Sequence, residues 1–315
     1  MLSGLLALTA VVNCGVVSGI LSAMTESAFR FAITDYPLAP ATLYKVGGAA
    51  QLALLPETAE ETLEAYAWMC GQPGPHLILG CGSNVLIADE GFPGIVLFTS
   101  GLNRVGVLDG DRWRVGGGVE LDRLVRDVIV PQNYEGAGAL TGIPGSVGGA
   151  IYMNAGTVNG STCQFLESVD LATPEGPRTV DVDASLYDYR SQSFCKEDDL
   201  IVQAVFQFHR SSANQQAVYD HYTERRKEKQ PEGDCCGCVF KNPENDHAGR
   251  LIEACGLKGA RRGGAVISEQ HANFIMNEHK ATFQDIVDLI ELCKSEVRSK
   301  FGVELHEEVR IIRVS

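Results

Sequence analysis

The stretch Gly80-Cys-Gly-Ser-Asn-Val-Leu-Ile-Ala-Asp-Glu-Gly-Phe-Pro-Gly94 follows a short apolar segment at residues 76–79. It does not fit a Rossmann fingerprint, because Val85 stands where the third glycine should be and a strand is predicted to follow. No Lys-Ser/Thr pair follows, which excludes a P-loop. A tight turn remains, whose free N–H groups could form an anion-binding nest with Ser83 and Asn84 as further donors. An ordinary hairpin turn is the alternative.

The chain contains a second glycine-rich stretch, Leu140-Thr-Gly-Ile-Pro-Gly-Ser-Val-Gly-Gly-Ala-Ile-Tyr-Met-Asn-Ala-Gly156. Both stretches are flanked by apolar segments, and glycine lets a backbone approach a ligand closely because it has no Cβ. Two such loops in one chain suggest one long ligand. A dinucleotide cofactor offers a pyrophosphate to one loop and a flat ring to the other.

Composition and charge narrow the function further. The chain has 315 residues, 45% of them hydrophobic, and a net charge of −14. A broad nucleic-acid surface is therefore not expected, since phosphate binding needs concentrated Lys and Arg. One basic cluster, residues 225–230, could meet an anionic ligand. Ten cysteines, scattered apart from those at 235, 236 and 238, suit a reducing cytosol and predict a cytoplasmic protein.

The stretch from Leu2 to Met24 carries no charge and is long enough to span a bilayer. It lacks the positive first region of a signal peptide. Three interpretations stay open: an upstream extension before a start at Met24, a membrane anchor, or a cleaved signal. Membrane contact is expected only if residues 2–24 are real and retained.

Hydrophobic periodicity predicts a mixed chain of helices and strands. Strands are expected at residues 51–55, 76–79, 85–88, 94–98, 113–118, 200–209, 264–268 and 272–277. Helices are expected at residues 56–68, 121–130, 211–229, 248–255 and 282–301. Thr58 with Glu61, and Thr282 with Asp285, have the spacing of helix-capping pairs. The glycines between 135 and 156 argue against regular structure throughout that segment. The composition shifts near residue 210, which marks a domain boundary.

The two glycine-rich stretches resemble the flavin-binding segments of the MurB family, the UDP-N-acetylenolpyruvoylglucosamine reductases. Further segments match in order between Tyr36 and Ile312: Tyr189-Arg-Ser-Gln-Ser-Phe194, Gly237-Cys-Val-Phe-Lys-Asn-Pro243, residues 248–259, His271-Ala-Asn-Phe-Ile-Met-Asn277 and Leu305-His-Glu-Glu-Val-Arg310. Each motif alone is weak, but the ordered set is specific. The short span from Arg190 to Cys238 resembles the subgroup that lacks an extra substrate-covering loop.

The resemblance implies an α+β fold: an FAD-binding fold of the vanillyl-alcohol-oxidase (PCMH) type in two subdomains, plus a C-terminal α+β substrate domain. The expected division is residues 25–98 with 308–315 returning to them, then 99–210, then 211–307, after the extension at 1–24. Non-covalent FAD is implied, with its pyrophosphate held by Gly80, Cys81, Gly82, Ser83, Asn84, Val85 and Leu86. The flavin side is expected to contact Gly142, Ile143, Pro144, Gly145, Ser146, Gly148, Gly149 and Asn154.

The implied reaction is reduction of UDP-N-acetylglucosamine enolpyruvate to UDP-N-acetylmuramate in peptidoglycan precursor synthesis, with the cell-shape and cell-division roles of that pathway. NADPH reduces the flavin, whose N5 gives a hydride to C3 of the enol ether. Arg190 is expected to bind the substrate carboxylate, Glu308 to polarise it as a protonated acid, and Cys238 to give the proton to C2. Substrate contacts are expected from Tyr189, Arg226, Lys229, Asn242 and His271. The family usually has a serine at the position of Cys238.

The cluster Cys235-Cys-Gly-Cys238 also admits a metal or redox sensor. Its spacing is poor for zinc, which takes four ligands, and the pattern around a thioredoxin-type C-x-x-C is absent. Another flavin oxidoreductase of the same fold is the remaining alternative.

Overall fold

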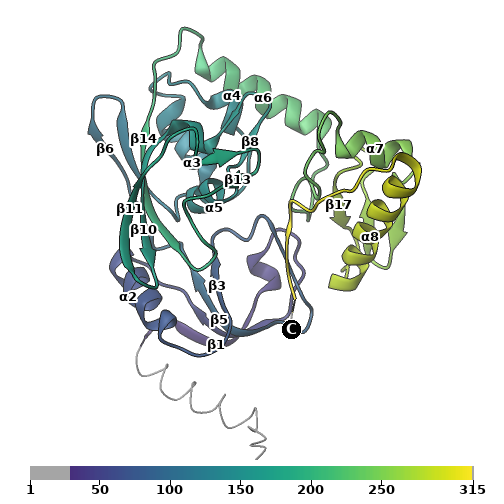
Figure 1. Ribbon diagram of the computed structural model, residues 1–315, viewed down its shortest axis with the longest axis horizontal. Helices are drawn as coiled ribbons and strands as arrows, with labels where there is room; N and C mark the ends of the chain where they lie inside the picture. The colour runs from purple at the N-terminus through teal and green to yellow at the C-terminus, as the bar shows by residue number, and fades with distance from the viewer. Residues whose placement is uncertain (1–28, 314–315) are drawn as a thin grey trace, which may run out of the picture.

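The computed structural model describes residues 29–313 (Figure 1). The apolar stretch from Leu2 to Met24, with its three interpretations, lies outside these residues. Within the described part, no helix combines the length and the apolar character needed to cross a bilayer.

The first region contains a four-stranded sheet with the order β1-β2-β5-β3, and β4 lies outside this sheet. β1 pairs antiparallel with β2, whereas β2 and β3 each pair parallel with β5. Its elements are β1 (Ala32–Pro37), β2 (Ala49–Leu54), α2 (Ala59–Cys70), β3 (His76–Leu79), β4 (Val85–Ile87) and β5 (Phe92–Phe98). Thr58 and Glu61 form the expected capping box at the start of α2. The first glycine-rich turn connects β3 to β4.

The second region is built on a five-stranded antiparallel sheet with the order β11-β10-β14-β7-β6. Its strands are β6 (Val105–Asp109), β7 (Arg112–Gly116), β10 (Leu166–Thr173), β11 (Gly176–Asp181) and β14 (Leu200–Gln207). Two short hairpins lie beside it: β8 (Gly156–Thr157) with β9 (Gly160–Ser161), and β12 (Tyr187–Asp188) with β13 (Ser191–Gln192). The second hairpin leaves Tyr189 and Arg190 as a two-residue turn.

Short helices share a hydrophobic core with the five-stranded sheet. The expected helix at 121–130 is present as α3 (Leu121–Leu124) running into a π-helical turn (Val125–Ile129). The glycine-rich segment contains two short helices, α4 (Ala137–Leu140) and α5 (Val147–Tyr152). Ser146 caps α5, because its hydroxyl accepts a hydrogen bond from the Gly149 N–H at 3.2 Å. Capping explains how a helix forms among glycines that individually disfavour it.

The third region begins with α6 (Gln215–Lys229), which crosses from the five-stranded sheet to the far side of the molecule (Figure 1). α7 (Ala248–Ala254), β15 (Arg261–Arg262), β16 (Ala265–Ile267), β17 (Ile275–Asn277) and α8 (Phe283–Phe301) follow. β15, β16 and β17 form one sheet, against which α8 packs. Thr282 and Asp285 form the expected capping box of α8. α6 starts four residues later than expected, where Asn214 caps it.

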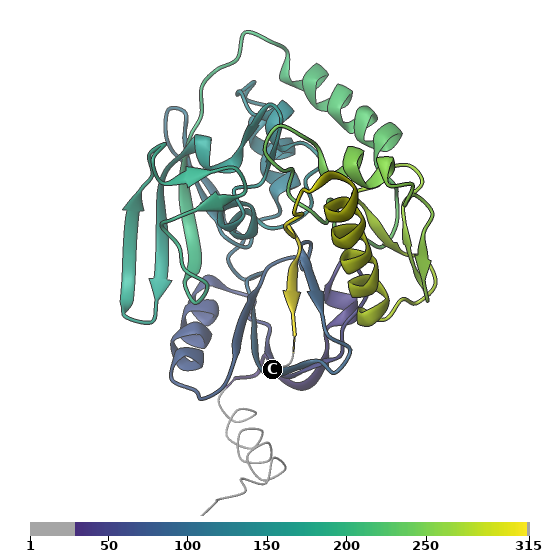
Figure 2. The ribbon, with the colours of Figure 1, turned by 45° about the vertical axis from the view of Figure 1, so that its right-hand side comes forward.

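The last strand, β18 (Arg310–Ile312), leaves the third region and pairs parallel with β4 of the first (Figure 2). The side chains of Tyr44, Val46 and Leu86, from the first region, belong to the same hydrophobic core as α7 and α8. The first and third regions are therefore held together by packing as well as by strand pairing. The boundaries expected for four segments remain predictions.

Candidate active site

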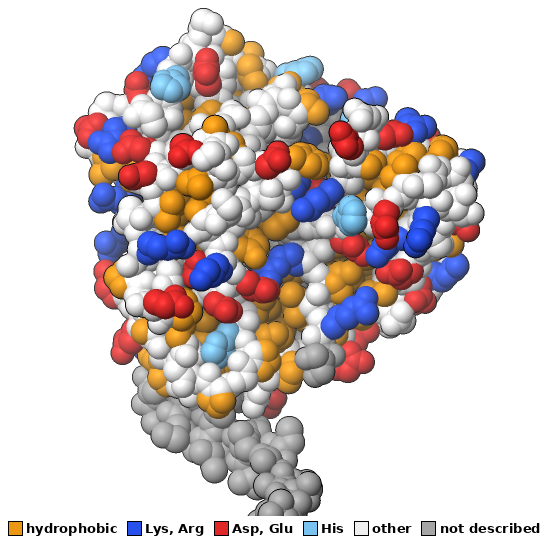
Figure 3. All heavy atoms as spheres, in the orientation of Figure 1, with side chains coloured by type: hydrophobic (Ala, Val, Ile, Leu, Met, Phe, Trp, Pro, Cys, Tyr) orange, Lys and Arg blue, Asp and Glu red, His pale blue; other side chains and the backbone are white. Residues whose placement is uncertain are grey.

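One cavity of about 770 Å³ lies where the three regions meet. Ligand pockets typically occupy about 300–1,000 Å³, so this one has room for a large ligand. Both glycine-rich stretches, the Tyr189–Arg190 turn, the cysteine cluster and the segment before β18 contribute to its wall. On the face shown in Figure 3, acidic and basic side chains are interspersed, and no broad basic surface is present there.

The turn between β3 and β4 offers unpaired donors to the cavity. Within residues 29–313, the backbone N–H groups of Cys81, Gly82, Ser83 and Asn84 donate to no protein acceptor. Gly82 has φ +60°, and a Cβ there would lie 2.0 Å from the Ala41 carbonyl oxygen. Consecutive free amides in such a turn form a concave anion site. This geometry fits the phosphates of a dinucleotide.

The two glycine-rich stretches contact each other. A Cβ on Gly80 would lie 2.2 Å from Ser146 Oγ, and one on Gly145 would lie 2.7 Å from Ser83 Oγ. The missing Cβ atoms therefore let the two loops close into one wall. The wall, the free amides and the cavity volume together fit an FAD molecule, which residues 80–85 would hold at the phosphates and residues 143–149 at the ring.

Twelve of the fifteen expected cofactor residues line the cavity, and three do not: Gly142, Leu86 and Asn154. Leu86 follows Val85 on a strand, so its side chain points to the opposite face and is fully buried in the core. The Gly142 carbonyl accepts a hydrogen bond from Arg226 at 2.8 Å. Asn154 is buried, and its amide bonds the backbone of Cys163 and Asp188.

Arg190 is fixed by three acceptors. Its Nε donates to Glu308 Oε1 at 2.7 Å, and its two Nη atoms donate to the carbonyls of Asn154 and Gly156 at 3.5 and 2.7 Å. The backbone has φ +51°, a left-handed conformation that is uncommon for a residue with a Cβ. A guanidinium has five N–H groups, so two remain to bind a carboxylate.

The Glu308 side chain is an acid that is largely buried. Only 17% of its side chain is exposed. Burial raises the pKa of its carboxyl above the usual range, against the lowering effect of Arg190 and Lys241. Burial acts in this direction because it disfavours the charged form. The Glu308 N–H donates to the Val239 carbonyl at 2.7 Å, which ties this segment to the cysteine cluster.

Cys238 carries a strongly held proton. Burial raises the pKa of its thiol to about 12, with a further contribution from Glu308 when its carboxyl is ionised. Arg190, Arg226 and a hydrogen bond with Asn273 oppose this rise. A free thiol has a pKa near 8.5, so the protein environment makes the thiolate scarcer at neutral pH. The thiol therefore keeps its proton at neutral pH, although as a weaker acid than a free thiol, and is poorly suited to acting as a nucleophile.

The five expected substrate residues also line the cavity. Arg226 and Lys229 extend from the C-terminal part of α6, and Asn242 accepts the Ala248 N–H at the start of α7. His271 Nδ1 accepts the Asn273 N–H at 3.2 Å, and burial lowers the pKa of the imidazole. The neutral ring therefore keeps its proton on Nε2, as a donor at the cavity wall.

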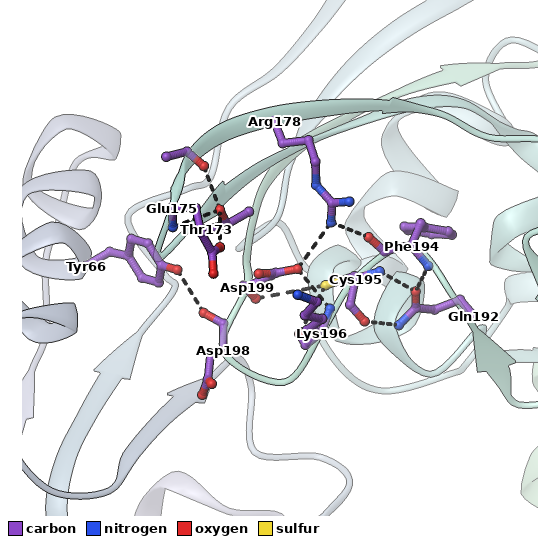
Figure 4. Close-up of polar contacts among 11 residues, drawn as sticks. Tyr66, Thr173, Glu175, Arg178, Gln192, Phe194, Cys195, Lys196, Asp198 and Asp199 are labelled. Atoms are coloured by element: carbon purple, nitrogen blue, oxygen red, sulfur yellow. Dashed lines mark hydrogen bonds and ion pairs between the residues drawn. The ribbon is translucent and has the colours of Figure 1, made fainter.

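The buried Asp199 carboxylate anchors a loop that lines the cavity, and Figure 4 shows its polar contacts. Asp199 accepts the Lys196 N–H at 2.9 Å and the Arg178 guanidinium at 3.4 Å. The Tyr66 hydroxyl of α2 donates to the Asp198 carbonyl at 2.8 Å. The anchored loop presents Glu197, which pairs with Arg310 of β18. Both residues of that ion pair line the cavity.

The geometry can be compared with known proteins. Residues 50–180 match the family model of an FAD binding domain, and residues 229–312 match that of the UDP-N-acetylenolpyruvoylglucosamine reductase C-terminal domain. The UDP-N-acetylenolpyruvoylglucosamine reductase of Clostridium botulinum (strain Hall) is 36% identical over 292 residues, covering 89% of this chain and 92% of that protein. The chain belongs to the UDP-N-acetylenolpyruvoylglucosamine reductase family.

Two further family members agree. The Geobacillus kaustophilus reductase is 37% identical over 291 residues, covering 90% of this chain and 93% of that protein. The crystal structure of the reductase (MurB) from Thermus caldophilus superposes with a TM-score of 0.75 at 31% identity, covering 90% and 98% of the two chains. The expected fold is confirmed: an FAD-binding domain of the vanillyl-alcohol-oxidase (PCMH) type, followed by the family's C-terminal domain.

The family motifs left several cavity residues unassigned: Tyr152, Tyr222, Arg225, His247 and Arg310. Arg225 belongs to the basic cluster at residues 225–230, but the sequence assigned a cavity contact to none of the five, because such side chains also occur on solvated surfaces. Asn273 could have been singled out, since it lies in an apolar strand-like stretch where an amide needs partners.

The metal-site interpretation of the cysteine cluster finds no support in the described residues. No group of three metal-ligating side chains is assembled anywhere in residues 29–313.

Proposed function

We propose that the protein reduces UDP-N-acetylglucosamine enolpyruvate to UDP-N-acetylmuramate, with FAD as its cofactor and NADPH as its co-substrate. The observation that carries this proposal is the convergence of Arg190, Cys238 and Glu308 on the cavity that both glycine-rich loops enclose. The family membership supports the reaction, which is a step in peptidoglycan precursor synthesis. A cytoplasmic location suits the free cysteines of the described residues.

Each of the three residues has a defined task. When bound, FAD supplies the hydride that it takes from NADPH. Arg190 binds the substrate carboxylate with its two free N–H groups. Glu308, protonated as its raised pKa favours, donates a hydrogen bond to the same carboxylate and stabilises the negative charge that develops there. Cys238 gives its thiol proton to C2 of the substrate. NADPH and one proton are consumed for each enol ether reduced.

The remaining cavity residues bind and orient the substrate. Arg226 and Lys229 meet the diphosphate, because they carry the positive charge of α6 at the cavity wall. Asn242 and Tyr189 lie side by side, with the Asn242 N–H donating to the Tyr189 hydroxyl at 3.3 Å. His271 offers its Nε2–H. These residues hold the reacting carbon atoms of the substrate near Cys238. Such positioning increases the reaction rate, because the reacting groups are already in the productive geometry.

The test is NADPH oxidation by the purified, FAD-loaded protein with and without the UDP-sugar enol ether. Turnover that requires the UDP-sugar supports the proposal. Bleaching of the flavin by NADPH without turnover would leave the cofactor in place and overturn the substrate. Oxygen consumption with an alcohol substrate would instead indicate another oxidoreductase of the same fold.

A further inference from the structure

Lys241 is a cation beside the catalytic groups to which nothing above assigns a role. Its Nζ donates to the main-chain carbonyl of Arg190 at 3.3 Å. The Lys241 N–H donates to the His306 carbonyl at 2.9 Å, and the neighbouring Phe240 forms an antiparallel bridge with Glu307. Lys241 therefore stands between the Arg190 turn and the Glu308 segment, and contacts both.

The bond from Lys241 reaches Arg190 where its backbone is strained. A residue with a Cβ is strained in the left-handed conformation and persists there only where surrounding contacts hold it. The two-residue turn is held at two adjacent points, because the Tyr189 hydroxyl accepts the Asn242 N–H next to the Lys241 contact. Both points join the second region to the third. They fix the turn from which the guanidinium reaches Glu308.

We propose that Lys241 is a positioning residue: its ammonium group holds the Tyr189–Arg190 turn against the third region and thereby keeps the Arg190 guanidinium in place against Glu308. The inference rests on the proposed function. Lys241 acts through Arg190 and Glu308, and has no assigned contact with the substrate. It is half-buried and is not part of the cavity wall.

Lys241 also contributes to the electrostatics of the site. The charged and titratable groups facing the Glu308 carboxyl are Arg190 from the hairpin turn, Lys241 and Cys238 from the segment after α6, and Cys236 beside them. Lys241 and Arg190 are the two cations that favour the ionised carboxylate. Without Lys241, Glu308 keeps its proton to a higher pH. Loss of the ammonium group thus has an electrostatic effect that loss of packing alone does not have.

The experiment compares the holoenzyme with Lys241→Met and Lys241→Arg across a range of pH. We expect kcat to fall about 10- to 100-fold in Lys241→Met, the range in which misplaced catalytic groups reduce rate. We also expect the alkaline limb of its kcat profile to move to higher pH, since Glu308 has to be protonated. Lys241→Arg keeps a cation and a donor, and should restore both properties in large part.

Lys294→Met is the matched control. Lys294 Nζ pairs with Glu307 at 2.8 Å, so this variant removes an ammonium group from the carboxylate next to Glu308 without contacting Arg190. It should leave the profile unchanged. A Lys241→Met profile with an unmoved alkaline limb would overturn the inference, whether or not kcat falls. Absence of turnover in the wild type would instead overturn the proposed function, so the two failures are distinguishable.

Discussion

Arg190 Nε and Glu308 Oε1 lie 2.7 Å apart, although 118 positions separate the two residues in the chain. Both side chains are largely buried, with 16% and 17% of their surface exposed. The pair joins the second region to the segment that returns to the first. It therefore couples assembly of the fold to assembly of the candidate catalytic site, since neither side chain reaches the other until the regions have docked.

The planar geometry of Arg190 should be essential. Arg190→Lys keeps the charge but cannot bond Glu308, two carbonyls and a substrate carboxylate together. We expect substrate reduction to slow by about 10² to 10³, the usual effect of removing one donor from a developing charge. Reduction of the flavin by NADPH should persist. Stopped-flow measurement of the two half-reactions checks this expectation.

Arg112→Lys is the control for the Arg190 substitution. Arg112 also pairs with a glutamate, Glu167, but lies on the five-stranded sheet and does not line the cavity. Both half-reactions should keep their wild-type rates in this variant. Equal rates for Arg190→Lys and the wild type would refute the assigned role of Arg190.

The thiol of Cys238 should act as an acid. We expect Cys238→Ala to slow substrate reduction by about 10² or more, the usual contribution of a general acid, while flavin reduction by NADPH stays intact. Cys238→Ser should retain activity, because a hydroxyl also carries a transferable proton. Cys255→Ala, which removes a free cysteine outside the cavity wall, is the control. Equal loss in both half-reactions would point to a structural thiol.

The Glu308 carboxyl should lower the free energy of unfolding at neutral pH. Because its pKa is raised in the folded state, the folded protein holds this proton more tightly than the unfolded chain does. The free energy of unfolding therefore falls as the pH rises from the unfolded pKa, near 4.3, through the folded one. The stability of Glu308→Gln relative to the wild type should thus increase between pH 4 and pH 8. Thermal unfolding at saturating FAD measures it.

Glu307→Gln provides a control of opposite sign. The partner Lys294 contributes to a lowered pKa of Glu307, although burial opposes it. A lowered pKa stabilises the fold above the unfolded value, and this stabilisation is lost as the pH falls through the folded value. Relative to the wild type, Glu307→Gln should therefore lose stability as the pH rises. Parallel trends in the two variants would contradict the assigned protonation states.

The Gly82 turn should tolerate no side chain. In Gly82→Ala, the new Cβ would meet the Ala41 carbonyl oxygen at 2.0 Å, so the turn and its free amides must move. We expect purified protein with little bound FAD, measured from the flavin absorbance per protein. Gly110→Ala is a close match, since Gly110 also has a positive φ but no neighbouring heavy atom within 4 Å among the described residues. That variant should keep its FAD. Full occupancy in Gly82→Ala would refute the nest.

Local sequence patterns predicted much of the regular structure. His76–Leu79 is a strand at its expected bounds, and both capping boxes lie where the spacing placed them. These features depend on residues a few positions apart, so short-range chemistry decides them. The glycine-rich segment was less predictable, because Ser146 supplies a cap that lets α5 form among glycines.

The sequence by itself determined the family, through an ordered set of motifs, and determined that a cysteine stands where the family usually has a serine. It could not determine the state of that cysteine. Only the tertiary structure places Cys238 beside Glu308 in a buried wall, which raises the pKa of its thiol to about 12. Only the tertiary structure turns Leu86 into the core and brings Lys241 to Arg190. Burial and long-range contacts decide these properties, because protonation and side-chain direction depend on neighbours that are distant in sequence.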